Sequence, residues 1–526
     1  MSSLALVLLA SPLWTGQAEP GAPRVAGADV PTAPASTPSP DAHRALEQAR
    51  ALQQADLSGG MMSGGLGIER LGEDWYARLD LALAYDFEKF GFGLQLPVRF
   101  RIIDEDPKAN GDLLGVVRGE DWDSVADVLK LIRYVYVGQK DGKGPFYARI
   151  GALTDLSFGH GTIVHRYRND VDINRWRVGV AGSVRSGAFS VEGFVGDVTQ
   201  PYLMGVRGAV KPLELLLGSG PLLGLEVGTS VVVDVEAPLA SCLSRTDAAG
   251  EDGQVDPCID PVEARAFPET ATFETVVDDE GRPLAADSRA AAIVGIDVGW
   301  PVLDTGLLSI TPYVDLNKLT AVQDGWGLHA GVWWKVAAPL ALDTLVVDLR
   351  TEYRAVSRDY RGPYVNATYE IERYESLRAE PTRFGTPSKL GFLCGSEPGG
   401  DCMGGGDLRH GFFLELLAGL PQWVFLGGEL LDYTGDESDG TFRLTLEIPA
   451  LEAVQVQASY FRVGVRNLED LFAIDDRSAV LARARVPIQT FFSLDVEWAR
   501  VWRGDPQGGY EPVDDYRVGV GFSLPL

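Results

Sequence analysis

The chain has 526 residues, of which 45% are apolar and 23% are charged, and this composition excludes a disordered protein. Lys and Arg total 46 against 74 Asp and Glu, so a net charge of −28 argues against a nucleic-acid partner. No run of about 18 apolar residues is present, which excludes a transmembrane helix. The composition still permits a transmembrane β-barrel, because that class spreads its apolar surface over alternate residues.

The N-terminal region has the pattern of a targeting segment followed by a spacer. Residues 4–10 form a short apolar run, and Gly16-Gln17-Ala18 is a small-x-small site, so we expect a signal peptide over 1–18, with a short core helix as the alternative. Residues 19–57 then read as a Pro/Ala-rich linker and one short periplasmic helix.

Period-two alternation begins near residue 58 and continues to the end of the chain. Apolar and polar residues alternate over 75–87 and again over 90–102, with a tight turn between the two runs. Each run is longer than a typical soluble strand and matches a tilted strand that spans a membrane. The same pattern recurs at 306–318, 341–355, 440–449 and 490–502.

The connections between these runs fall into two classes. Short turns alternate with longer loops, and the longer loops lie at about 103–127, 155–174, 237–289, 356–408, 465–476 and 503–515. Short periplasmic turns opposite long external loops are typical of outer-membrane barrels, whereas a soluble sandwich has no reason to sort its connections in this way. Trp326 and Trp334 also share one strand face, at a spacing close to that of two aromatic girdles.

The last strand carries the clearest signal. Six apolar residues alternate with small or polar ones, and they are Tyr516, Val518, Val520, Phe522, Leu524 and Leu526. Here the chain resembles bacterial outer-membrane β-barrel proteins of porin-like size, whose last strand is a signal read by the assembly machinery, although it ends in Leu instead of Phe. The resemblance covers about 58–526 as architecture and reaches no characterised subfamily. It implies the outer membrane of a Gram-negative cell, with lipid, lipopolysaccharide and the assembly machinery as partners.

The strand count refines the fold class. About 19 strands are clear, but barrels of this kind have an even number, so the Gly-rich segment 59–71 is needed as a further, weak strand. We therefore expect an all-β fold: a transmembrane antiparallel up-and-down β-barrel of about 20 strands over 58–526, with 18 strands as the alternative.

The four cysteines suggest disulfides within loops. Three pairings are possible, and the economical one joins Cys242 to Cys258 and Cys394 to Cys402, in an oxidising exterior. No His accompanies either pair, so zinc is not expected there, and we expect no metal or other cofactor. The acidic loops, such as 237–289 with 12 acids against 4 Arg, are expected to keep the surface solvated, with divalent-cation bridging to lipopolysaccharide as an alternative.

The leading functional hypothesis is a passive channel for small hydrophilic solutes. A barrel of this size leaves an aqueous lumen, and we expect inward charges of both signs. These lumen-facing charges are Arg78, Asp80, Arg99, Arg101, Asp315, Asp348, Arg350, Glu352, Arg354, Arg443 and Glu447. The alternatives are a transporter of apolar compounds and a structural or adhesive barrel that acts through its long loops.

The loop 155–174 differs from the other long loops and is the expected constriction of the pore. It is rich in cations, and its apolar residues, among them Ile163 and Val164, gain nothing from exposure. Folded inward, its Arg side chains would favour anions, and packing at the rim is the alternative. The constriction residues are His160, His165, Arg166, Arg168, Asp170, Asp172, Arg175 and Arg177. This loop is also the one place where a catalytic set could assemble, but we expect no enzyme.

Overall fold

The computed structural model describes residues 59–525 with interruptions. The residues within this range that it leaves undescribed are 72–73, 88, 104–116, 123, 140–143, 171–176, 218–222, 246–257, 269–270, 272, 277–282, 341–342, 375, 377–386, 395–407, 422, 435–439, 452–453, 466, 468, 476, 490 and 505–509. The expected signal peptide, linker and N-terminal helix (1–57) lie outside the described residues, as does Leu526.

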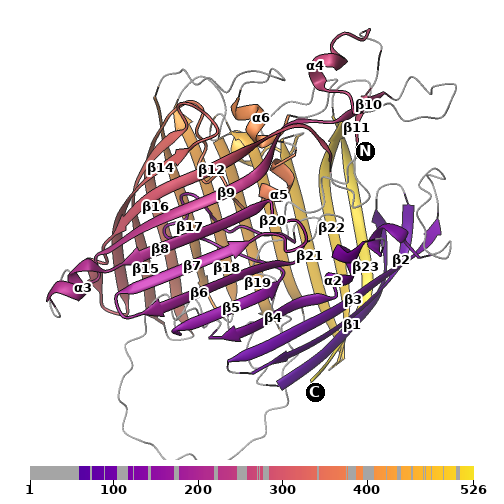
Figure 1. Cartoon of the computed structure of the whole chain (residues 1–526). Helices are drawn as coiled ribbons and strands as arrows, with labels where there is room; N and C mark the ends of the chain where they lie inside the picture. Colours follow the sequence, from indigo (N-terminus) through magenta and orange to yellow (C-terminus); the bar gives the residue numbers. More distant parts are fainter. Residues whose placement is uncertain are drawn as a thin grey trace, which may run out of the picture.

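Twenty strands of six or more residues in the described part of the chain form one closed antiparallel barrel (Figure 1). In chain order they are β1 (Gly59–Leu71), β2 (Asp74–Asp86), β3 (Phe90–Ile103), β4 (Ile132–Gly138), β5 (Phe146–Gly151), β6 (Gly179–Ser186), β7 (Phe189–Val195), β8 (Leu203–Val210), β9 (Glu226–Ser241), β12 (Ala285–Gly299), β14 (Leu308–Leu319), β15 (Trp326–Pro339), β16 (Thr344–Val356), β17 (Arg409–Leu420), β18 (Val424–Thr434), β19 (Gly440–Leu451), β20 (Val454–Val465), β21 (Ser478–Gln489), β22 (Phe492–Gly504) and β23 (Tyr510–Pro525). The fold class and the strand number expected from the alternation are confirmed.

The barrel closes through its first and last strands. β1 pairs with β23 in antiparallel register, with Met61 opposite Pro525 and Glu69 opposite Arg517, and β1 pairs with β2 on its other side. The Gly-rich segment, which the even count required as a strand, therefore provides the closing strand. Closure leaves no free sheet edge, as a barrel in lipid requires.

The two faces of the wall differ as the alternation predicts. On β14, Val314 and Leu316 are about half exposed, whereas Asp315 and Asn317 between them are almost fully buried. Trp326 and Trp334 are both partly exposed on the outer face of β15. Large apolar side chains exposed on the outside and polar ones enclosed inside are the inverse of a soluble protein, and they fit a wall surrounded by lipid.

The remaining elements are short and lie in the connections. They are the strands β10 (Leu243–Arg245), β11 (Phe273–Thr275) and β13 (Leu303–Asp304), the 3-10 helices η2 (Gly119–Asp121) and η3 (Asp470–Phe472), and the helices α2 (Val125–Leu129), α3 (Pro212–Leu217), α4 (Pro261–Ala264), α5 (Tyr369–Glu372) and α6 (Lys389–Leu393). None of the helices in the described part of the chain is long and apolar enough to cross a membrane.

Two long connections differ from their expected bounds or course. β9 continues to Ser241 and β12 already begins at Ala285, because the two strands remain paired at their outer ends. The loop between them is therefore shorter than 237–289. The 356–408 connection was expected to be an external loop. Its described parts instead pack against inward-facing wall residues, because several of its tyrosines are buried there.

The described cysteines are all in disulfides. Cys242 bonds to Cys258, as the loop-internal pairing predicts, and Cys394 is also disulfide-bonded. Cys402 lies outside the described residues.

We predict that Cys394 pairs with Cys402 and that the barrel does not depend on either bond. Non-reducing peptide mapping should recover one linked peptide for each pair, because each bond closes a short loop within one connection. Reduction should leave the heat-modifiable barrel band unchanged on a gel. A peptide linking Cys258 to Cys394 would contradict the pairing.

We predict that the double variant F522D/L524D is not assembled. The two positions share the lipid-facing parity of Val518 and Val520, so each Asp should cost about 1–2 kcal/mol and remove the amphipathic pattern of the last strand. The matched control is Ser523→Asp, which lies on the opposite face of the same strand. Outer-membrane fractionation should show the control at normal levels and the double variant depleted, whereas equal levels would refute the prediction.

Candidate functional site

The interior of the barrel is entered by the chain directly after β5. Gly151 ends this strand at a φ of 127°, a left-handed value that favours glycine. A Cβ at this position would lie 2.5 Å from the carbonyl oxygen of Arg133, so only glycine fits where the chain leaves the wall. Residues 152–170, called the inner loop below, then cross to the inward face of distant strands.

Inward-facing polar groups of the wall hold the tip of the inner loop. His160 Nδ1 lies 2.8 Å from Asp315 Oδ1 on β14, and Thr162 Oγ1 donates to Asp315 Oδ2 at 2.8 Å. Arg350 on β16 donates to the carbonyl oxygen of His160. These contacts span more than 150 residues of sequence, and they place the loop tip inside the barrel instead of at its rim.

A second segment, residues 357–376 with α5, packs on the inner loop. Val164 and Val365 form a parallel bridge, in which His165 N donates to Val365 O at 2.9 Å and Val365 N donates to Ile163 O at 3.0 Å. The two segments share one apolar core, to which the wall contributes. This core includes Phe158, Ile163, Val164, Tyr167, Phe194, Val232, Ile293, Tyr360, Tyr364 and Tyr369. The two segments thus pack as one body inside the barrel.

Glu370 on α5 joins this body to the wall. Its two carboxylate oxygens accept hydrogen bonds from Tyr167 in the inner loop, at 2.6 Å, and from Tyr202 beside β8. Burial raises the pKa of Glu370 above its ordinary value of 4.5, against the lowering effect of the two tyrosines and Arg373. Burial and the neighbouring Glu370 also raise the pKa of Tyr167 well above its usual range, so this hydroxyl remains a donor.

A second ion pair fixes the same helix. Arg373 donates to Asp234 on β9 at 2.7 Å, and Tyr369 donates to the same carboxylate at 2.7 Å. Asp234 is fully buried and Arg373 is 5% exposed, so neither partner can be removed without leaving an uncompensated charge.

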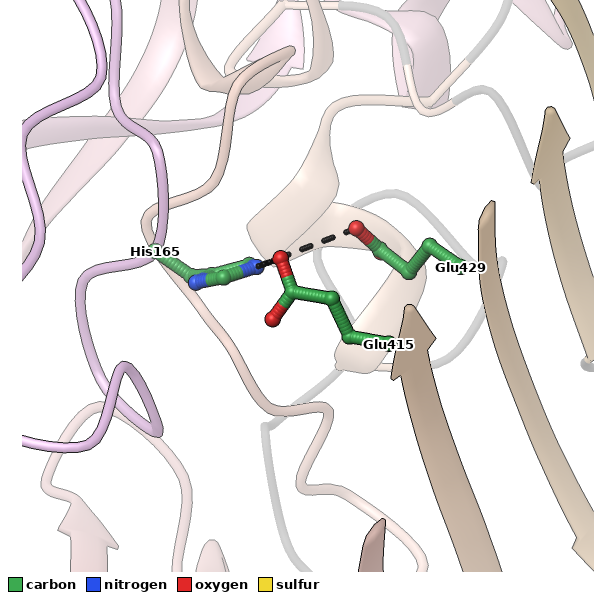
Figure 2. A group of neighbouring side chains, drawn as sticks. All are labelled: His165, Glu415 and Glu429. Carbon is green, nitrogen blue, oxygen red and sulfur yellow. Dashed lines mark ion pairs between the residues drawn. The ribbon is translucent and has the colours of Figure 1, made fainter. Parts of the chain in front are cut away.

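The expected constriction residues are placed as follows. Arg166 contacts Glu415 on β17 at 2.6 Å, Arg168 donates to Asp170 at 2.9 Å, and Arg177 lies 3.5 Å from Asp197. His165 lies near Glu415 and Glu429, as Figure 2 shows. Asp172 and Arg175 lie outside the described residues. The loop is therefore inside the barrel, but its charges are engaged in ion pairs.

The expected lumen-facing charges divide into two groups. The first lies against the inner loop and its partner segment, where it binds them or forms buried pairs: Asp315, Arg350, Glu352 and Arg354. The second lies along β2 and β3 in ion pairs with carboxylates of β1, β2 and η2: Arg78 with Glu69 and Asp80, Arg99 with Glu69 and Asp121, and Arg101 with Asp74. Of the remaining three, Asp348 accepts a hydrogen bond from the indole of Trp333, and Glu447 is buried. Arg443 lines a cavity together with Arg166.

The wall from β21 to β2 carries a ladder of inward charges that retains access to water. Arg483 pairs with Glu497, Arg485 contacts Asp495 at 2.5 Å, and Arg517 contacts Glu69 at 2.9 Å. Arg483, Arg517 and Arg78 each keep about a quarter of their side-chain surface exposed. This wall therefore faces solvent, whereas the wall from β9 to β18 is largely covered by the inner loop and its partner segment.

Two of the cavities in the described part of the chain border the inner loop. One, of about 240 Å³, is lined by residues of β6–β9 that include Arg185, Glu192 and Arg207. The other, of about 70 Å³, is lined by His165, Arg166, Arg443 and parts of the second segment. Arg207 also reaches Asp297 at 2.6 Å beside Gly159 of the loop, so the larger cavity adjoins the inner loop.

Sequence reasoning missed the second segment and the two glutamates beside His165. A signal for the segment was present, because its closely spaced tyrosines and Ile371 have no reason to lie in a solvated loop. Glu415 and Glu429 carried no such signal, since at least 250 residues separate each of them from His165 and only the strand register brings the two glutamates together.

Comparisons with known proteins agree with the barrel at the level of general fold. No protein-family model matches the chain, and no curated protein matches its sequence. Among solved structures, OccK11 (OpdR) of Pseudomonas aeruginosa is 12% identical, covers 89% of this chain and 96% of its own, and has a TM-score of 0.33. Wzi of Escherichia coli, a carbohydrate-binding barrel involved in group 1 capsule assembly, is 12% identical over 92% of this chain and 89% of its own (TM-score 0.30). The ferric enterobactin receptor PfeA of Pseudomonas aeruginosa is 9% identical over 89% and 81% (TM-score 0.35).

Similarities this distant carry no argument about function, so the surroundings of the barrel follow from its own wall. Closure through β1 and β23, together with large apolar side chains exposed on the outer face, leaves lipid as the surroundings of this wall. The protein is a closed transmembrane-type β-barrel. Its inner loop and the second segment, held by Glu370 and Asp234, form the candidate functional site.

We predict that Glu370→Gln removes part of the pH dependence of stability. The folded state raises the pKa of Glu370. The contribution of this group to the free energy of unfolding is therefore complete below pH 4.5 and is lost as the pH rises through the raised pKa. Because the amide of E370Q cannot titrate, the thermal unfolding midpoint of this variant should fall less between pH 4.5 and pH 7.5 than that of the native protein. The control is Glu263→Gln, on an exposed residue of α4. Equal pH slopes in the native protein and E370Q would contradict the prediction.

Proposed function

We propose that the protein is a channel for passive diffusion of small hydrophilic solutes across the outer membrane. The observation that carries the proposal is the asymmetry of the interior: a solvent-accessible ladder of charges faces a body formed by the inner loop and residues 357–376. Twenty strands enclose more space than side chains alone can fill, so water has room between the two. A transporter of apolar compounds would need an apolar wall, and the ladder from β21 to β2 is instead charged.

The constriction of this channel is the inner loop, and its selectivity is set by the excess of cations beside it. Arg166 and Arg443 line the smaller cavity beside the loop, together with Arg361 of the second segment and Lys389 of α6, and these four cations outnumber the two glutamates of the same lining, Glu372 and Glu429. Fixed cations around a narrow passage raise the local concentration of anions. We therefore propose a preference for small anionic or polar solutes over cations.

Planar-bilayer recording tests the channel directly. Purified, heat-modifiable protein should insert with stepwise conductance and show a reversal potential that favours anions in a KCl gradient. Persistent silence of folded protein would overturn the channel.

We predict that the double variant R166Q/R168Q shifts the reversal potential toward cations. Neutral glutamines keep polar contacts and avoid a third carboxylate beside Glu415, which charge reversal of Arg166 would introduce. Arg265→Gln, on an exposed position of the 242–284 connection, is the control and should leave the reversal potential unchanged. An unchanged potential in R166Q/R168Q would mean that the inner loop does not line the path.

A further inference from the structure

A row of four charged side chains crosses the inward face of β16 to β19. The register places Arg350 opposite Glu415, Glu415 opposite Glu429, and Glu429 opposite Arg443. The two glutamates are therefore direct cross-strand neighbours. Like charges directly opposite each other destabilise a sheet, so the position between the glutamates favours a cation.

The inner loop places an imidazole over this pair. His165 Nε2 lies 3.6 Å from Glu415 Oε1 and 3.8 Å from Glu429 Oε2, and Figure 2 shows the ring directed between the two carboxylates. His165 is 7% exposed, and its Nε2 has no hydrogen-bond partner. A ring nitrogen that is buried, aimed at two carboxylates and without a hydrogen bond needs an explanation.

The separations are longer than direct hydrogen bonds and closer to the spacing of ligands that share one metal ion. Both distances exceed the 2.7–3.2 Å of an ordinary N–H···O hydrogen bond by several tenths of an ångström. Ligands held about 2.0–2.2 Å from a tetrahedral Zn²⁺ lie roughly 3.3–3.6 Å from one another. The three ligand atoms lie within 4.8 Å of one another. From this geometry we infer that His165, Glu415 and Glu429 form a binding site for a divalent cation of the Zn²⁺ type.

The donor set decides the class of metal. Imidazole suits Zn²⁺ and its first-row neighbours, whereas Ca²⁺ and Mg²⁺ prefer oxygen ligands in larger number. The cavity of about 70 Å³ is lined by both His165 and Glu429, so it offers an entry path and room for a water ligand. This site is distinct from the cysteine pairs, where no histidine is at hand.

The charge balance of the cluster limits the affinity. The negative charges of the two glutamates are balanced by the positive charges of the two arginines in the row. Arg166 adds a further positive charge at 2.6 Å from Glu415 Oε1. Arg166 therefore competes with the metal for the same carboxylate oxygen, and its removal should tighten binding. The bound ion would tie the inner loop to β17 and β18, so that the ion fixes the position of the constriction.

Calorimetric titration of the folded, detergent-purified protein with Zn²⁺ tests the site independently of any channel activity. We expect one Zn²⁺ per chain at micromolar concentration and no comparable binding of Ca²⁺ or Mg²⁺. Loss of an outer-shell partner already weakens metal sites by about 10- to 100-fold, so loss of a ligand in H165Q or E429Q should cost at least about tenfold. R166Q should bind more tightly than the native protein.

His410→Gln is the matched control, because His410 is an exposed histidine of β17 outside the cluster. Heat-modifiability on a gel establishes that each variant is folded, and if one ligand variant does not fold, the other carries the test. Native binding that is weakened in a folded ligand variant but not in H410Q supports the site. No saturable Zn²⁺ binding by the native protein, or equal binding by the folded ligand variants and H410Q, would overturn it.

Discussion

The architecture depends on the pairing of β1 with β23, because a sheet edge left open in lipid has backbone groups that nothing can satisfy. By composition β1 is the weakest strand of the wall, with five glycines among its 13 residues. Its Glu69 is almost completely buried and contacts Arg99 at 2.6 Å and Arg517 at 2.9 Å. One carboxylate thus links β1 to both β3 and β23, so ion pairing supports the closing strand where side-chain packing is weakest.

Closure with twenty strands creates an interior too wide for wall side chains to fill. Part of this space is occupied by the inner loop and residues 357–376, which share an apolar core with the wall. A few buried carboxylates, above all Asp315, Glu370 and Asp234, accept the hydrogen bonds that connect these segments to each other and to the wall. Each carboxylate accepts from at least two groups, so the body is held by a small number of contacts, each with a large local effect.

The strand pattern and the strand number could be predicted from the sequence, because an alternation with period two is imposed on every strand by lipid on one side. For the inner loop the sequence left two placements open, inside the lumen or packed at the rim, because Ile163 and Val164 exclude only free exposure. The partners of the loop could not be predicted. Whether Arg166 meets Glu415 or another acid is decided by the stagger of strands far apart in the chain, and alternation fixes only the face of a residue.

The strands differ greatly in length, and the membrane must adapt to this difference. β4 and β5 have seven and six residues, whereas β9 has 16. A strand needs about 9–11 residues to cross the hydrocarbon layer, so β4 and β5, like β6 to β8 with seven or eight residues each, are shorter than the bilayer is thick. Lipids beside them have to thin locally, at a cost of a fraction of a kcal/mol per ångström of hydrophobic mismatch. Two such barrels that place these sectors side by side share one thinned region, so the bilayer itself supplies an attraction between them.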